Sequence, residues 1–113
     1  ANHFKRWKEE FKELFNGERI VMLYGSTITD YSKARDIDIM IVRKKGEFGE
    51  IYEIISKRQK YIPKKIHFID LTSEEFLKNI KQRQKAIIDI VKNAIILFGQ
   101  NRYVELIKNV TGI

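Results

Sequence analysis

Two aspartates, separated by one residue, begin an otherwise apolar stretch of the sequence, Asp36-Ile37-Asp38-Ile39-Met40-Ile41-Val42. In a β-strand alternate side chains point to one face, so the Asp36 and Asp38 carboxylates would lie about 6.6 Å apart along the strand. Neighbouring carboxylates repel each other, and their desolvation is costly. A divalent cation removes both problems, and oxygen ligands favour Mg²⁺ or Mn²⁺, which also bind phosphates. The alternative is a strand that starts at an exposed edge, with both aspartates facing water.

A glycine and a serine, Gly25 and Ser26, follow the preceding apolar run, and nine residues separate Ser26 from Asp36. A glycine lets the backbone approach a ligand closely, and the amides after it can hold an anion. This order places a phosphate cradle and a pair of metal ligands at the same end of a two-strand unit. Lys33 and Arg35 lie between Ser26 and Asp36 and could neutralise phosphate charge. The alternative is that both side chains are solvated and have no role in binding.

The hydrophobic pattern predicts the elements that position these residues, in the order helix, strand, strand, helix, strand, helix, strand, helix. The strands are expected over 19–24, 36–42, 65–71 and 94–98. Helices are expected over 4–15, from 48 to a stop before Pro63, from a capping box at 72–75 to Lys92 or to a break near 82–84, and over 101–110. We therefore expect an α/β (α+β) fold, with a mixed sheet of about four strands flanked by helices, as a single domain over 1–113.

The composition excludes several kinds of protein. The 113 residues contain no cysteine, which excludes a disulfide scaffold, a thiolate zinc site and a cysteine nucleophile. The only histidines are His3 and His67, so a histidine-rich metal site is excluded as well. The apolar runs are far shorter than the ~20 residues that span a bilayer, so we expect a cytoplasmic protein with no membrane contact. The formal charge of +7 could attract phosphates, but basic and acidic residues are interspersed and form no blocks, which favours a solvated surface.

The residues Tyr24-Gly25-Ser26 and Asp36-Ile37-Asp38-Ile39 resemble the motif of the DNA polymerase β-like nucleotidyltransferase superfamily, and above all its minimal nucleotidyltransferases. The similarity extends from Ile20 to Gly99. In that family the third strand ends in a further acidic residue, which nominates Asp70 here. The chain departs from the family in lacking an arginine and a glycine soon after Ser26. His67 alternates with Asp70 along the strand, so it is interpreted as structural or as a surface residue.

The resemblance implies a polymerase β-like fold and phosphoryl transfer assisted by two Mg²⁺ ions, with Mn²⁺ as a possible substitute. Asp36 and Asp38 would bridge the ions, and Asp70 would complete the second ion's shell or act as the general base. The nucleotide-binding residues would be Gly25, Ser26 and Lys33.

Small members of the family are often paired with a HEPN-domain protein, as antitoxin to toxin, and can transfer AMP onto it. A catalytic core without an acceptor-binding domain needs an acceptor site on another chain or in a homodimer. The first hypothesis is therefore a Mg²⁺-dependent enzyme that transfers AMP from ATP to a hydroxyl of a protein partner. The alternatives are a module that neutralises its partner by contact alone, and a nucleic-acid-binding domain.

Overall fold

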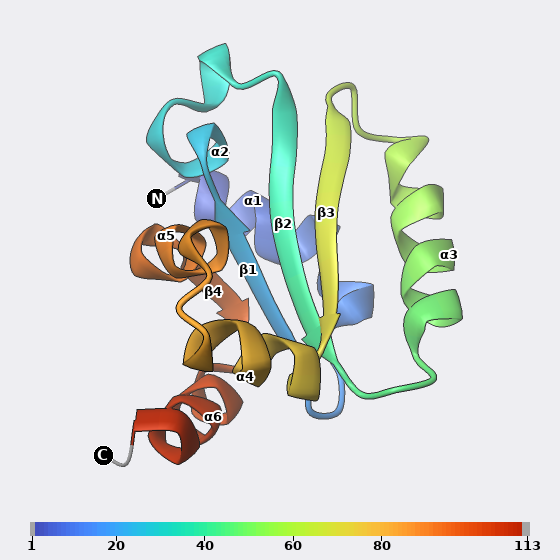
Figure 1. Cartoon of the computed structure of the whole chain (residues 1–113). Coiled ribbons are helices and arrows are strands. Elements are labelled where there is room, and N and C mark those ends of the chain that lie inside the picture. The colour runs from blue at the N-terminus through green and yellow to red at the C-terminus, as the bar shows by residue number, and fades with distance from the viewer. Residues whose placement is uncertain (1, 112–113) are drawn as a thin grey trace.

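The computed structural model describes residues 2–111, and its four strands form one mixed sheet (Figure 1). The strands are β1 (Ile20–Tyr24), β2 (Asp36–Arg43), β3 (Lys65–Thr72) and β4 (Ile95–Phe98), in the order β3-β2-β1-β4. β1 runs antiparallel to both of its neighbours, whereas β2 and β3 are parallel. The predicted mixed sheet of four strands is therefore confirmed.

The described helices are α1 (Asn2–Glu10), α2 (Ser26–Thr29), α3 (Phe48–Gln59), α4 (Ser73–Lys81), α5 (Lys85–Asn93) and α6 (Gln100–Thr111), with 3₁₀ turns at Lys12–Leu14 and Tyr31–Lys33. The first predicted helix is shorter than expected, because its last turn is the 3₁₀ turn. The helix predicted after Thr72 is broken between α4 and α5, where Arg83 has a φ of 53°. No described helix is long and apolar enough to cross a membrane.

Both faces of the sheet are covered, and each has its own apolar core. On one face Ile37, Ile39 and Ile41 pack in a cluster with Trp7 of α1 and Ile51 of α3. On the other face the strand residues pack against the helices that follow β3, in a cluster of Ile20, Met22, Met40, Val42, Phe76, Ile87 and Leu106. In Figure 1, α1 lies behind the strands and α4 in front of them. This two-sided burial explains why β1 is a continuous apolar run rather than an alternating one.

A capping box fixes the point where β3 ends and α4 begins. The Thr72 hydroxyl accepts a hydrogen bond from the Glu75 amide at 3.1 Å, and the Glu75 carboxylate accepts one from the Thr72 amide at 2.8 Å. The second bond holds the pKa of Glu75 below its ordinary value. The capping box predicted at 72–75 is confirmed.

Candidate active site

The two aspartates lie at the start of β2, beside the end of β1. Because β1 and β2 are antiparallel, Tyr24 at the end of β1 is the register partner of Asp38. Asp36 and Asp38 are both half-buried, and the Asp38 side chain keeps only 20% of its surface exposed. The turn at Gly25 and the aspartates therefore meet at the same end of the two inner strands, and Asp38 does not simply face water.

Gly25 packs directly against the Asp38 carboxylate. Its φ of 69° lies in the left-handed region, which favours glycine. A Cβ placed on Gly25 would stand 2.7 Å from Oδ2 of Asp38, closer than such atoms approach. The backbone of the turn thus comes as near to the carboxylate as the chain permits, which is the reason for glycine at this position.

Thr27 ties this turn to both aspartates and was not singled out from the sequence. Its side chain is buried, and its hydroxyl accepts a hydrogen bond from the Asp38 amide at 2.9 Å. The same hydroxyl donates to the carbonyl oxygen of Asp36 at 3.4 Å. Thr27 therefore holds α2 over the first residues of β2.

The other residues proposed for nucleotide binding are more exposed. Ser26 is exposed at the first position of α2, next to Gly25, where its hydroxyl and amide are accessible to a ligand. The Lys33 side chain is 84% exposed and lies 3.8 Å from Asp30. Arg35 is also exposed. The structure thus places Ser26 at the site, whereas Lys33 has its described ion pair with Asp30 rather than with Asp36 or Asp38.

Asp70 does not belong to this site, and its assignment as a metal ligand or general base is wrong. In the parallel pairing of β2 with β3, Asp70 is opposite Ile41 and His67 is opposite Asp38. The offset of three positions along the strands corresponds to about 10 Å, and side-chain alternation puts Asp70 on the opposite face of the sheet. There Asp70 forms a bidentate ion pair with Arg43, with oxygen–nitrogen distances of 2.7 and 2.9 Å. Both side chains are nearly buried, so Asp70 is a structural residue.

His67 occupies the position beside Asp38 instead. Its Nδ1 atom lies 3.3 Å from Oδ1 of Asp38, and its side chain is 58% exposed. The alternation predicted between His67 and Asp70 is correct, but the face that carries the site is the one with His67. The register of the parallel pair decides this, and it is not visible in the sequence of either strand.

A pocket of about 430 Å³ opens next to Gly25, between the end of β1, α2 and α5. Ile28, Ile90 and Tyr24 give it an apolar lining, with Thr29, Asp89 and Asn93 as polar groups. Two effects raise the pKa of the Tyr24 phenol to about 12: burial is the larger, and the negative charge of Asp38 is the smaller. The phenol is therefore protonated at neutral pH and can donate a hydrogen bond at the edge of the site.

The donor groups fit a divalent cation that is bound together with a phosphate ligand. Among residues 2–111, no three His, Cys, Asp or Glu side chains are arranged to hold a metal ion by themselves. The site with three carboxylates is thus not formed. Mg²⁺, however, is usually held by one or two carboxylates together with substrate phosphates, and Asp36 and Asp38 supply two carboxylates on one face of β2.

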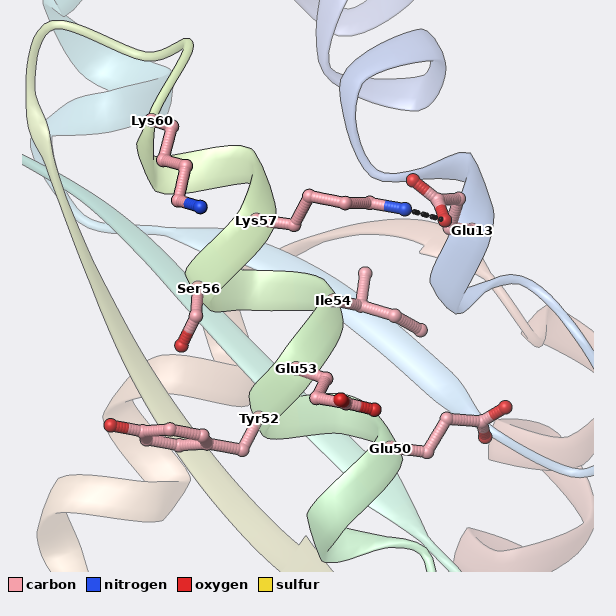
Figure 2. A pocket seen from close by; sticks show the side chains of 8 residues that line it. All are labelled: Glu13, Glu50, Tyr52, Glu53, Ile54, Ser56, Lys57 and Lys60. Carbon is pink, nitrogen blue, oxygen red and sulfur yellow. Dashed lines mark hydrogen bonds and ion pairs between the residues drawn. The ribbon is translucent and has the colours of Figure 1, made fainter.

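A second pocket, of about 610 Å³, lies along α3 and away from these residues. Figure 2 shows that its lining wraps around the helix, with Tyr52 and Ser56 on one side and Lys57 directed toward Glu13 on the other. Its charged lining has three glutamates and two lysines, and the excess of negative charge makes it poorly suited to a triphosphate. The pocket beside Gly25 is the better candidate.

The comparison with known families agrees with this geometry. The sequence profile described as "Polymerase beta, Nucleotidyltransferase" matches residues 9–102. The chain belongs to this nucleotidyltransferase family. The match contains all four strands and every residue of the site, and the sheet flanked by helices is consistent with a polymerase β-like fold. No curated protein and no solved structure matches the chain. The chain is thus a nucleotidyltransferase by family membership. That it belongs to the minimal nucleotidyltransferases stays a prediction.

Proposed function

We propose that this nucleotidyltransferase transfers AMP from ATP to a hydroxyl of a protein partner, with Asp36 and Asp38 as its metal ligands. One observation carries the proposal: the two carboxylates share one face of β2, and the Gly25 turn is packed against Asp38. Family membership supports nucleotidyl transfer in general. ATP as donor and Mg²⁺ as cofactor, with two ions and Mn²⁺ as a substitute, are part of the proposal.

The residues around the site have separate tasks in this reaction. Gly25 and Ser26 hold the β- and γ-phosphates through backbone amides and the serine hydroxyl, and Thr27 keeps Asp38 oriented. The apolar side chains of Ile28 and Ile90 offer a surface for the nucleoside. Bound Mg²⁺ would neutralise phosphate charge and lower the pKa of the acceptor hydroxyl.

The transfer is a substitution at the α-phosphorus. The acceptor oxygen forms a bond to this phosphorus, the bond to the oxygen that bridges to the β-phosphorus breaks, and pyrophosphate leaves. The hydroxyl proton passes to solvent or to a basic group at the site. Because Asp70 is paired with Arg43 on the far face, it does not take this proton.

The acceptor is proposed to be a separate protein, as for an antitoxin that modifies its toxin in the cytoplasm, where ATP is available. A HEPN-type partner is the expected one, and a second copy of the chain is the other source of an acceptor site. The half-buried aspartates and the exposed Ser26 and His67 leave this end of the sheet open to such a molecule.

The experiment that tests the proposal uses ATP labelled at either the α- or the γ-phosphate. The pure protein, Mg²⁺ and labelled ATP are mixed with a lysate of the organism that encodes the protein, and proteins are separated by mass. We expect a labelled band with α-labelled ATP only. The Asp38→Asn variant should lose the label. The Lys108→Ala variant, which alters an exposed side chain of α6 outside the site, should retain most of it.

Three other outcomes would contradict the proposal. Label from the γ-position would indicate a kinase reaction. Labelled nucleic acid in place of protein would identify a different acceptor. No transfer from either position would favour the module that acts by contact alone.

A further inference from the structure

His67 is the one histidine whose side chain the structure places at the candidate active site, in contact with a proposed metal ligand. We infer that its imidazole is itself a ligand of the bound cation, and that it shifts the preference of the site from Mg²⁺ toward transition-metal ions such as Mn²⁺ and Co²⁺. This inference rests on the proposed function, since it concerns the same cation. It adds a nitrogen donor where the sequence analysis expected only carboxylates.

The first argument is the register of the sheet. Asp38 and His67 are partners across the parallel strands β2 and β3, so their side chains emerge on the same face. The only acidic residue of β3, Asp70, is on the opposite face, paired with Arg43. The position on β3 nearest to Asp38 is thus filled by an imidazole.

The second argument is the distance between the two donor atoms. Oδ1 of Asp38 and Nδ1 of His67 are 3.3 Å apart. Two ligands that each bind one ion at about 2.1 Å, at angles between octahedral and tetrahedral, lie roughly 3.0–3.4 Å apart. The observed separation falls within this range, so one ion can bind both atoms without movement of either strand.

The third argument is access. His67 is 58% exposed and lies on an edge strand, since β3 is the last strand of the sheet. An incoming ion bound to nucleotide phosphates therefore reaches the imidazole directly. The phosphates of the bound nucleotide would supply further oxygen ligands to the same ion.

The expected consequence is a change in metal preference. Mg²⁺ prefers oxygen ligands, whereas imidazole nitrogen is a good ligand for transition metals, whose affinity rises from Mn²⁺ through Co²⁺. A site in which the His67 imidazole joins the Asp38 carboxylate and the phosphate oxygens should therefore bind Mn²⁺ and Co²⁺ more tightly than a site with oxygen ligands alone. The competing explanation is that His67 only donates a hydrogen bond to Asp38 and positions it.

The test measures metal binding by the full chain with a non-hydrolysable ATP analogue, so that no turnover is needed. Isothermal titration with Mn²⁺ and Mg²⁺ compares the unmodified protein with His67→Ala and His67→Asp. The His3→Ala variant, which removes the chain's other histidine, is the matched control. Electron spin echo measurements on bound Mn²⁺ report nitrogen ligands directly, through coupling to the ¹⁴N nucleus.

We expect Mn²⁺ affinity to fall at least tenfold in His67→Ala, with little change for Mg²⁺ and none in His3→Ala. The ¹⁴N coupling should be present in the unmodified protein and absent in His67→Ala. His67→Asp should bind Mg²⁺ more tightly and lose the preference for Mn²⁺. Because His67 is exposed, these variants should fold, and thermal unfolding verifies this.

Failure of this inference is distinguishable from failure of the proposed function. If Mn²⁺ binds without ¹⁴N coupling and His67→Ala binds it normally, while Asp38→Asn does not bind it, the imidazole is no ligand but the carboxylate site stands. If the unmodified protein binds neither ion in the presence of the analogue, both proposals are overturned.

Discussion

Gly25 and Asp38 are packed so closely that a Cβ on the glycine would lie 2.7 Å from the carboxylate oxygen Oδ2. The turn after β1 thus depends on the aspartate in β2, although nine residues separate Ser26 from Asp36 in the sequence. The close contact also gives the carboxylate a defined position against the backbone that we propose to hold phosphates. This contact can be tested by substituting Gly25, with the same substitution at Gly46 as the control.

Gly25→Ala should cost more than the same change at Gly46. Both glycines have positive φ, but nothing lies within 4 Å of a Cβ at Gly46. We expect Gly46→Ala to lower the free energy of unfolding by about 1–2 kcal/mol through backbone strain alone, with normal transfer activity. Gly25→Ala adds the clash with Asp38, so we expect a larger loss of stability. Displacement of the carboxylate should reduce the transfer rate roughly 100-fold.

Urea unfolding and the rate of transfer from α-labelled ATP measure these two effects. Equal stability losses in Gly25→Ala and Gly46→Ala, with equal activity, would show that the contact between Gly25 and Asp38 affects neither the stability of the fold nor the transfer rate.

Thr27→Val should loosen the site, because valine has nearly the same shape but no hydroxyl. The Asp38 amide would lose its acceptor, at 2.9 Å in the structure, in a buried environment. We expect a loss of about 1–3 kcal/mol in the free energy of unfolding, and a lower transfer rate. Thr27→Ser keeps the hydroxyl and serves as the control, with most of the activity retained. A valine variant as active as the serine variant would rule out a positioning role for Thr27.

Asp70→Asn should destabilise the fold and leave the chemistry of the site intact. The substitution leaves the nearly buried guanidinium of Arg43 without its carboxylate partner, which costs about 3–5 kcal/mol in comparable buried pairs. The transfer rate per folded molecule should be unchanged. Removing both charges, in Arg43→Met with Asp70→Leu, should recover most of the stability, because no unpaired charge is left.

Chemical unfolding and activity assays at low temperature separate these effects. A double variant that is stable but inactive would return Asp70 to the catalytic machinery.

The sequence predicted the fold well because its main signals are local. Burial on both faces makes β1 a continuous apolar run, and the Thr72–Glu75 capping box is a pattern within four residues. The short helix α2 was missed because its four residues, Ser26–Thr29, have no helical periodicity of hydrophobic side chains. Its position depends on contacts with β2 that are distant in sequence.

The same distinction applies to the site. Gly25, Asp36 and Asp38 could be proposed together because they lie at the adjoining ends of two neighbouring strands. Asp70 was misassigned and His67 set aside because the choice between them depends on how β3 is aligned with β2. Two residues that alternate along a strand cannot be assigned to a face without this register. The nearest signal in the sequence was Arg43, a basic residue at the end of an apolar strand that required an acidic partner.

Tyr24 provides a titration that reports on the electrostatics of the site. Its pKa is raised from 10.0 to about 12, first by burial and second by the charge of Asp38. In ultraviolet titration without divalent ions, we expect a tyrosine that ionises near pH 12 and is absent in Tyr24→Phe. In Asp38→Asn the pKa of Tyr24 should fall only in part, since burial is the larger cause and is unchanged.

The sign of the effect on stability follows from the same shift. Between pH 10 and about 12 the folded protein keeps the Tyr24 proton while the unfolded chain releases it. The stabilisation from Tyr24 is therefore complete below pH 10 and is lost as the pH rises toward 12. In Tyr24→Phe the free energy of unfolding should fall less steeply over this range, as measured by urea unfolding at pH 9 and pH 11. Equal slopes in the two proteins, together with an ordinary tyrosine titration, would mean that Tyr24 is neither desolvated nor close to the Asp38 charge, and that the edge of the site is more open than the structure indicates.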